Sequence, residues 1–253
     1  MAGTALSGRL NWLVSHLAGI RQETATARTL ILDVPGWPGH LPGQHVDVRL
    51  TAEDGYSTER SYSIASAPDG TRLELTVQRL ADGEVSPYLT EVFDLGYPLE
   101  VRGPIGGYFA WRPALAPPVL LIGGGSGVVP LMAMLRTRIA TASTAPMRLI
   151  YSTRSPDTLL YAEELRRIAI AGQDAGLTAE IVYTRSAPPG WTGRVGRLDA
   201  AWLRTLTGAR AASSRCYICG PTGFVENVAD LLTSQGLADW QIRTERFGPG
   251  GGS

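Results

Sequence analysis

The sequence predicts two domains: an antiparallel β-barrel, followed by an α/β domain with a doubly wound parallel sheet. In the first half, short apolar runs alternate with Gly, Pro and Asp turns, which is typical of a barrel or sandwich. In the second half, continuous apolar strands alternate with helical segments, which is typical of a parallel sheet covered on both faces. The proline-rich stretch "WRPALAPP" separates the two patterns, so we expect domains at residues 1–112 and 113–247 and a flexible tail at 248–253.

Six strands and one short helix are expected in the first domain. The strands are short runs bounded by turn residues, at 9–20, 27–34, 43–50, 60–66, 72–79 and 97–103. The helix is expected in "SPYLTEVF", because Ser86 is a favoured N-cap residue and Pro87 then occupies the first helical position.

Strands and helices are expected to alternate in the second domain. The strands are the apolar runs at 119–123, 147–153, 178–184 and 216–220 and the closing stretch at 240–247. The helices between them are expected at 128–140, 159–171, 198–206 and 223–235.

Composition and charge limit the functions that the chain can have. Its 253 residues contain 23 Lys plus Arg and 23 Asp plus Glu, so the net charge of zero gives no attraction to nucleic acid or to a membrane surface. The longest strongly apolar run, "APPVLLI", is far shorter than the about 20 residues of a membrane span. With no secretory signal and only two cysteines, we expect a cytoplasmic protein, and we expect it to be a monomer.

The stretch "LLIGGGSGVVP" places Gly123, Gly124, Gly125 and Gly127 between a buried strand and a helix. Backbone N–H groups at such a helix start can approach a pyrophosphate because no Cβ atoms stand in the way. The stretch is neither a Walker loop nor the standard dinucleotide fingerprint, since Pro130 stands where a third Gly or Ala is expected. The alternative is a tight strand–helix turn that needs glycine for its backbone alone.

An acidic residue usually follows the second strand of an NAD site, where it binds the ribose 2′-hydroxyl. Here that strand ends in Arg154, the next strand ends in Arg185, and Arg194 follows in "GWTGR". The ends of adjacent parallel strands lie side by side, so Arg154 and Arg185 are expected to converge on the 2′-phosphate of NADP. The alternative is that each is a solvated surface cation, in which case NADPH would have no advantage over NADH.

The pair Cys216 and Cys219 in "CYICG" does not predict a metal site. Residues three apart in a strand point to opposite faces, which argues against a disulfide or a shared metal ion. Two thiolates are also too few for an iron–sulfur cluster, and His16, His40 and His45 show no ligand spacing. We therefore expect no metal, with Cys216 in the core and Cys219 at the carboxyl end of its strand, where its sulfur can lie against a flat ring.

The stretch "RSYSIASAPDG" opens with a cation and an aromatic residue flanked by hydroxyls. Arg60 can pair with a diphosphate, Tyr62 can stack on a planar heterocycle, and Ser63 can hydrogen-bond the edge of that ring. Farther along, the helix start at 83–86 offers further N–H groups to phosphate. Both features suit a bound flavin, whereas the alternative is an ordinary half-buried strand of alternating residues.

These motifs occur in the order found in the ferredoxin–NADP(H) reductase superfamily, which the chain resembles over nearly its whole length. The resemblance rests on "RSYS", "GEVS", "GGGSGVVP", the arginines of "STR", "YTR" and "GR", "CGP" and the final "TERF". It implies a flavin-binding antiparallel barrel followed by a nucleotide-binding parallel domain. It also implies FAD and NADPH as cofactors, with NADH less favoured.

The resemblance implies a role for residues at matching positions. FAD would be bound by these residues of the barrel and of the domain edges: Arg60, Ser61, Tyr62, Ser63, Thr76, Val77, Gln78, Glu84, Val85, Ser86, Ser126 and Phe247. The nicotinamide nucleotide would be bound by these residues at the ends of the parallel strands: Gly124, Gly125, Gly127, Thr153, Arg154, Thr184, Arg185, Arg194, Gly220, Pro221, Thr222 and Gly223. Ser63, Cys219 and Glu245 would lie at the reacting rings, although Glu245 can also be read as a plain surface carboxylate.

The implied activity is transfer of hydride from NADPH to FAD and then of single electrons to a separate ferredoxin, flavodoxin, oxygenase or cytochrome. Two features depart from relatives. Plant-type members end on an aromatic residue that covers the flavin, whereas "GPGGGS" follows Phe247 here, and the iron–sulfur domain of many oxygenase reductases is not found in this sequence. Two alternatives stay open: a reductase of free flavin or ferric chelates, and a non-catalytic flavin- or nucleotide-binding regulator.

Overall fold

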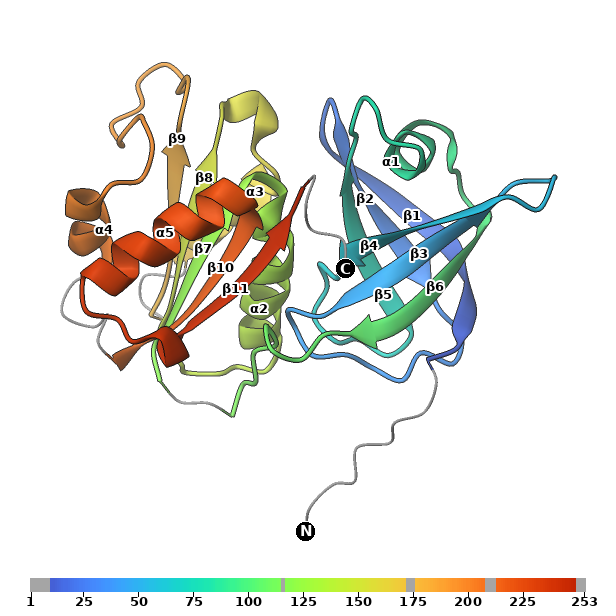
Figure 1. Cartoon of the computed structure of the whole chain (residues 1–253), viewed down its shortest axis with the longest axis horizontal. Coiled ribbons are helices and arrows are strands. Elements are labelled where there is room, and N and C mark those ends of the chain that lie inside the picture. The colour runs from blue at the N-terminus through green and yellow to red at the C-terminus, as the bar shows by residue number, and fades with distance from the viewer. Residues whose placement is uncertain (1–9, 115–116, 172–175, 208–212, 249–253) are drawn as a thin grey trace, which may run out of the picture.

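A computed structural model describes residues 10–114, 117–171, 176–207 and 213–248, which form two sheets joined by one connection (Figure 1). The first sheet is antiparallel and the second is parallel with helices, so the predicted fold class is confirmed. Residues 249–253 of the predicted flexible tail lie outside the described residues.

The first sheet closes into a barrel. Its six strands are β1 (Trp12–Thr24), β2 (Ala27–Asp33), β3 (His45–Thr51), β4 (Ser57–Ser63), β5 (Arg72–Gln78) and β6 (Pro98–Ile105). Their order in the sheet is β4-β3-β6-β1-β2-β5. The two ends of this order meet at a bridge between Ile64 and Leu75, where the N–H of Ala65 donates to the carbonyl oxygen of Glu74 at 2.7 Å.

A short helical segment covers one end of the barrel (Figure 1). It consists of α1 (Val85–Pro87) and a π-helical turn (Tyr88–Val92), and Glu84, not the predicted Ser86, is its N-cap. Ser86 lies inside the segment, where its Oγ accepts a hydrogen bond of 3.0 Å from the N–H of Leu80. Ser86 therefore braces the preceding loop instead of capping the helix.

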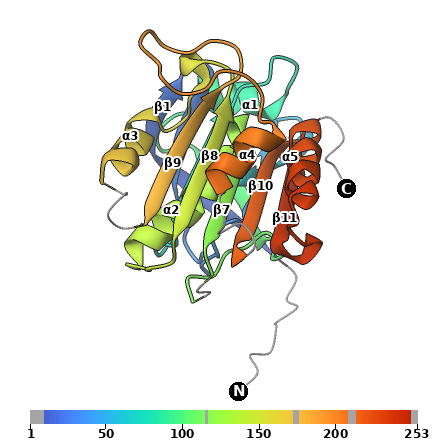
Figure 2. The same cartoon turned by 90° about the vertical axis from the view of Figure 1, so that its left-hand side faces the viewer.

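The second sheet has the strand order β11-β10-β7-β8-β9, which Figure 2 shows edge to edge. Its strands are β7 (Val119–Gly124), β8 (Met147–Thr153), β9 (Leu177–Tyr183), β10 (Arg215–Pro221) and β11 (Ile242–Phe247). The main helices are α2 (Val128–Ala140), α3 (Ala162–Ala171), α4 (Ala200–Thr207) and α5 (Thr222–Ser234). The chain runs outward from β7 through β8 to β9, then returns to β10 on the other side of β7, as a doubly wound sheet does.

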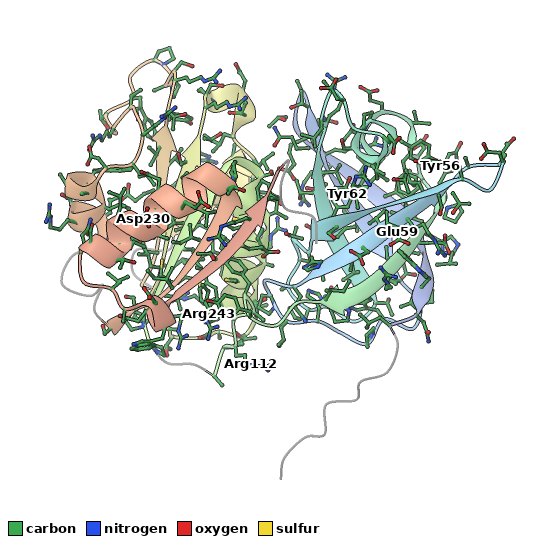
Figure 3. All side chains as sticks on the ribbon, viewed as in Figure 1. Tyr56, Glu59, Tyr62, Arg112, Asp230 and Arg243 are labelled. Carbon is green, nitrogen blue, oxygen red and sulfur yellow. The ribbon has the colours of Figure 1, made fainter. Side chains whose placement is uncertain are left out.

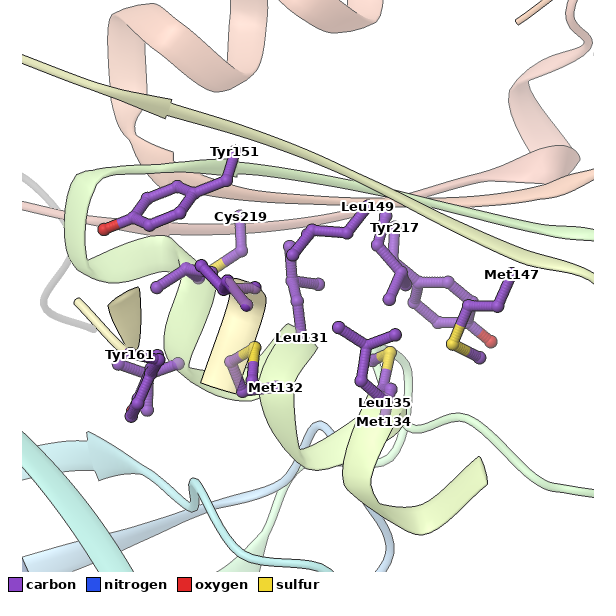
Figure 4. Packing of buried hydrophobic residues seen from close by; sticks show 14 of the residues in the cluster. Leu131, Met132, Met134, Leu135, Met147, Leu149, Tyr151, Tyr161, Tyr217 and Cys219 are labelled. Carbon is purple, nitrogen blue, oxygen red and sulfur yellow. The ribbon is translucent and has the colours of Figure 1, made fainter. Parts of the chain in front are cut away.

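The helices cover both faces of this sheet. α2 and α3 pack on the face toward the barrel, and α4 and α5 pack on the opposite face (Figure 1). Figure 4 shows the first of these cores, where Leu131 and Leu135 of α2 lie against Leu149 of β8 and Tyr217 of β10. The same core includes Ala65 of the barrel, so the two sheets share one hydrophobic interface.

Helix α3 begins three residues later than predicted. Tyr161 has a φ of 56°, which lies in the left-handed region and cannot belong to a right-handed helix. The predicted helix at 159–171 is therefore wrong over its first three residues, and α3 spans Ala162–Ala171.

Two further findings concern membrane-spanning helices and metal-binding clusters. None of the helices in the described part of the chain is long and apolar enough to cross a membrane. Within the same residues, no three His, Cys, Asp or Glu side chains lie close enough together to hold a metal ion.

Candidate functional site

An unpaired gap separates β4 from β5 beyond the bridge that closes the barrel. Because Ile64 pairs with Leu75, continued antiparallel pairing would set Tyr62 opposite Val77, but the described strands form no bridge there. The facing edges of β4 and β5 therefore present backbone N–H and C=O groups that no described strand satisfies. We call this unpaired stretch between β4 and β5 the barrel slot; its backbone groups are available to hydrogen-bond the edges of a ligand.

The predicted residues of β4 reach the barrel slot to different degrees. Tyr62 is half-buried, and burial raises the pKa of its phenol to about 12, so it is a neutral ring that can stack. It lies on the part of β4 nearer the second domain, whereas Tyr56 and Glu59 lie farther out (Figure 3). Ser61 does not share this face, because its Oγ donates to Asp47 Oδ1 at 2.7 Å on the outside of the sheet.

Arg60 is the cation beside the barrel slot, and its side chain is 56% exposed. It donates to the carbonyl oxygen of Glu59 at 2.7 Å and to Thr58 Oγ1 at 3.2 Å. Its guanidinium also lies 3.9 Å from a carboxylate oxygen of Glu84, at the start of α1. A diphosphate at Arg60 must therefore take the place of Glu84.

The other barrel residues predicted to bind a cofactor include Thr76, Val77, Gln78 and Val85, and most of their side chains are buried. Val77 and Val85 are fully buried in the barrel core. Thr76 is buried too, and its Oγ1 is hydrogen-bonded to Thr29 Oγ1 at 2.8 Å. Gln78, at the end of β5, is half-exposed. Val77 packs inside the barrel, and the Thr76 hydroxyl bonds Thr29 on the other face of β5. The prediction that these two residues line a cofactor therefore concerns their backbone groups.

The carboxyl ends of β7 and β10 meet where the winding direction of the second sheet reverses. A Cβ atom on Gly127 would lie 2.1 Å from the carbonyl oxygen of Cys219, so only glycine lets α2 start this close to β10. A Cβ atom on Gly220 would lie 3.1 Å from the carbonyl oxygen of Gly124. Gly125 has a φ of 56° with open space around its Cα. Such a crevice at the ends of parallel strands is where α/β sheets bind ligands.

The residues that flank this crevice are short and accessible. Ser126 lies in the half-buried turn between β7 and α2. Pro221 and Gly223 are exposed and Thr222 is half-buried at the start of α5. We call the strand ends of β7 and β10, with these two helix starts, the sheet crevice.

The ends of β8 and β9 lie side by side, as predicted. The N–H of Thr184 donates to the carbonyl oxygen of Thr153 at 2.8 Å, and the N–H of Arg185 donates to that of Arg154 at 3.0 Å. Both arginine side chains are exposed, and neither forms an ion pair with the acids that the structure describes. Thr153 is buried, and its hydroxyl bonds Thr158, so its side chain holds the turn and is not free for a ligand.

The backbone of Arg194 lies near the end of β9, but its guanidinium is paired with another residue. Its neighbour Val195 forms a bridge with Tyr183 at the end of β9. The Arg194 guanidinium forms an ion pair with Asp199 and lies 5.7 Å over the ring of Trp202. The same arginine lowers the pKa of Asp199. Arg194 therefore does not converge with the other two arginines in this structure.

The three residues expected at the reacting rings come from strands that meet at the domain interface. Ser63 of β4 pairs with His45 of β3, and Cys219 of β10 pairs with Glu245 of β11. Across the interface, His45 Nδ1 lies 3.8 Å from Glu245 Oε1. This contact places the Ser63 end of the barrel slot next to β11. No local pattern predicted His45, because its importance depends on a strand 200 residues away.

Glu245 carries an unsatisfied acidic group at this junction. Its Oε2 atom is buried without a hydrogen-bond partner among the described residues, and burial raises its pKa to about 7.

Cys219 is fully buried in the core beside α2, and its pKa is raised strongly, so its thiol is an apolar wall and not an exposed sulfur. Cys216 packs in the core on the other face, which confirms the predicted opposite orientation. Phe247 ends β11 and packs partly on the first core.

Models of two protein families match most of the chain. The oxidoreductase FAD-binding domain matches residues 21–110, and the oxidoreductase NAD-binding domain matches residues 121–230. The first match covers most of the barrel, and the second covers the parallel sheet except β11 and the start of β7.

Individual proteins also match over most of this chain. It is 34% identical over 232 residues to the glycine betaine monooxygenase reductase subunit of Chromohalobacter salexigens, covering 90% of this chain and 62% of that protein. It is 33% identical over 211 residues to ferredoxin–NADP reductase B of Sorangium cellulosum, covering 81% and 84% respectively. The flavohem-like FAD/NAD-binding domain of nitric oxide dioxygenase from Vibrio cholerae has a TM-score of 0.82 at 24% identity, covering 94% of this chain and 99% of that one. The chain spans only 62% of the length of the first relative.

Proposed function

Because the chain belongs to the ferredoxin–NADP(H) reductase superfamily, we propose that it takes hydride from NADPH onto a bound FAD and passes the electrons to a separate redox protein. One observation carries the proposal: the Ser63 end of the barrel slot adjoins Glu245 of β11, on the strand that pairs with β10 of the sheet crevice. A ring in the barrel slot and a nucleotide in the sheet crevice would meet at this junction. Close approach of two rings is what hydride transfer requires.

The barrel slot fits FAD, whose flavin ring accepts a hydride and releases electrons one at a time. Tyr62 would stack on the ring, Ser63 would hydrogen-bond its edge, and the backbone of 76–78 would satisfy the opposite edge. Arg60 would bind the diphosphate together with N–H groups at 84–86. Both Arg60 and Glu84 are more than half exposed, so their ion pair contributes about 0–1 kcal/mol and yields easily to a diphosphate.

The sheet crevice fits the diphosphate of the nicotinamide nucleotide. Backbone N–H groups of the turn at 124–127 and of Gly220, Thr222 and Gly223 would bind the diphosphate at the strand ends, where the glycines carry no Cβ atom. We propose that Arg154 and Arg185 bind the 2′-phosphate, with Thr184 beside them. Arg194 would join them only after leaving Asp199.

At the junction, the chain's own groups would handle protons and exclude water. Glu245 Oε2 has a pKa of about 7, so it can hold a proton at neutral pH or give it up without a large cost. Cys219 supplies an apolar wall, and Phe247 extends that wall at the end of β11. Their proposed role is to keep water away while two rings stack.

The acceptor class is inferred from relatives. One is named a monooxygenase reductase subunit and another a ferredoxin–NADP reductase, so a ferredoxin, flavodoxin, oxygenase or cytochrome is the proposed partner. We further propose that the protein is a monomer and that it is cytoplasmic; its two free, buried cysteines support a reducing compartment.

The visible spectrum of the purified protein tests this function. A retained flavin band that NADPH bleaches without oxygen, and that NADH bleaches less efficiently, is the expected result. A colourless protein that binds neither FAD nor NADPH would favour the non-catalytic regulator. A protein that retains no flavin but reduces added flavin would favour the free-flavin reductase.

A further inference from the structure

A buried polar network centred on Tyr161 connects the two domains. The Tyr161 side chain is 3% exposed, and its hydroxyl donates to Thr76 Oγ1 of β5 at 2.5 Å. Its backbone N–H donates to Glu23 Oε2 of β1 at 3.0 Å. Tyr161 stands just before α3, whereas both of its partners belong to the barrel. One residue of the nucleotide-binding domain is therefore tied to two strands of the flavin-binding domain.

The backbone of Tyr161 is held in a conformation that its own chemistry disfavours. A φ of 56° brings the Cβ of a bulky residue close to its own backbone, and such a conformation persists only where the surroundings hold it. Here the two barrel contacts hold it. Backbone outliers of this kind gather at functional sites, which directs attention to what Tyr161 connects.

On the nucleotide side, Tyr161 ends a braced connection that starts at Arg154. Within it, the hydroxyls of Thr153 and Thr158 lie 2.9 Å apart, and the N–H of Ser155 donates to Thr158 Oγ1 at 3.1 Å. These hydrogen bonds brace the first half of the connection. A nucleotide at Arg154 would be linked through it to Tyr161.

On the flavin side, Tyr161 contacts the strand that forms one wall of the barrel slot. Thr76 lies on β5, next to Leu75, where the barrel slot begins. Its hydroxyl is also shared with Thr29 at 2.8 Å, and Thr29 in turn donates to Glu23 Oε1 at 2.7 Å. The β5 wall of the barrel slot therefore contacts Tyr161, which is also the last residue of the connection that starts at Arg154.

We propose that Tyr161 is a positioning residue whose hydrogen bond to Thr76 sets the nicotinamide against the flavin. The inference rests on the proposed function. The hydroxyl touches neither cofactor, and it acts through β5 on one side and through the 154–161 connection on the other. It should therefore control how the two rings meet and not how tightly each cofactor binds.

A second interdomain contact lets the hydroxyl be removed without separating the domains. Arg136 of α2 donates to both carboxylate oxygens of Glu164 and, across the interface, to Glu74 at 2.9 Å and to the carbonyl oxygen of Ala65 at 2.8 Å. Its guanidinium also lies 5.0 Å over the Tyr161 ring. Tyr161→Phe keeps the ring, this cation–π contact and the Arg136 ion pairs, so it deletes only the hydroxyl.

The experiment compares Tyr161→Phe, Thr76→Val and their double variant, each purified with FAD. Three quantities are measured: the rate of anaerobic flavin reduction by NADPH, the dissociation constant of NADP⁺, and the change that NADP⁺ causes in the flavin spectrum. We expect the rate to fall about fivefold or more in each single variant, and the double variant to be no slower. The spectral change should shrink, while FAD content and NADP⁺ affinity stay within about twofold.

One control keeps the test specific. Tyr217→Phe removes another buried phenolic hydroxyl, whose partner is the carbonyl oxygen of Ala110 at 3.5 Å, and should leave all three quantities unchanged.

Several results would overturn the inference. Normal rates in Tyr161→Phe, additive losses in the double variant, or parallel losses of cofactor affinity would each show that the hydrogen bond does not position the rings. If the wild-type protein binds no FAD or no NADP⁺, the proposed function itself fails, and the inference fails with it.

Discussion

Preference for NADPH over NADH should depend on Arg154 and Arg185. The N–H of Arg185 donates to the carbonyl oxygen of Arg154 at 3.0 Å, so two exposed cations leave neighbouring backbone positions. Neither is neutralised by an acid among the residues that the structure describes. A 2′-phosphate bound by both side chains would gain two charged hydrogen bonds.

The expected size of the effect follows from exposure. A hydrogen bond to a charged group contributes about 1.5–3 kcal/mol, whereas an exposed ion pair contributes about 0–1 kcal/mol. These arginines are exposed but unopposed, so we expect about 1.4 kcal/mol each, which is about tenfold in kcat/KM. Arg194 should contribute less, because its phosphate contact replaces an existing pair with Asp199.

The assay is the ratio of kcat/KM for NADPH to that for NADH in wild type, Arg154→Ala and Arg185→Ala. We expect a clear wild-type preference for NADPH that falls about tenfold in either variant, while the NADH value barely moves. Equal losses for both cofactors would mean that the arginines support the fold. A wild-type enzyme that prefers NADH would refute the reasoning outright.

Three other predictions concern the flavin, the glycines and the acid. Replacing Arg60 and Tyr62 by Ala should lower the FAD bound per chain about tenfold or more, read from the flavin absorbance, and full yellow occupancy would contradict the assignment. Gly127→Ala should cost about 3 kcal/mol or more in unfolding free energy because its Cβ meets backbone 2.1 Å away, whereas Gly125→Ala, in open space, should cost about 1–2 kcal/mol. Burial raises the pKa of Glu245 from 4.5 to about 7, so folding favours the protonated form and the wild type loses stability as pH rises across that range. Glu245→Gln should match the wild type near pH 4 and be more stable by up to about 3 kcal/mol above pH 7, and equal denaturation curves at both pH values would show that the carboxylate is not desolvated.

Much of the fold was predictable because its signals are local. The apolar runs of β7, β8 and β10 mark buried parallel strands, and the structure has strands at nearly those residues. The side-by-side ends of β8 and β9 followed from the same pattern, since adjacent parallel strands end together. The motif glycines also follow from local sequence, because a strand that turns tightly into a helix requires them.

The errors arose where a competing contact decides the local structure. Ser86 has the chemistry of an N-cap, but Leu80 takes its hydroxyl and Glu84 begins the helix. Helical periodicity continues through Tyr161, yet contacts with the barrel hold its backbone in the left-handed region. The first contact lies within six residues but depends on the shape of the loop, whereas the second joins residues 85 positions apart and is not visible in a window of sequence.

The proposed functional residues of this protein are of two kinds: those in local sequence motifs and those at contacts between distant segments. The proposed residues of the barrel slot and the sheet crevice lie in short sequence motifs, because each set would hold one cofactor within one domain. The contacts proposed to bring the cofactors together, such as His45 with Glu245 and Thr76 with Tyr161, join strands and loops far apart in the chain. Substitutions in the motifs should therefore change cofactor affinity, whereas substitutions at the interface should change the rate at constant affinity. Hydride transfer depends on both kinds, and the sequence named Glu245 and Thr76 but not their partners His45 and Tyr161, which lie across the domain interface from them.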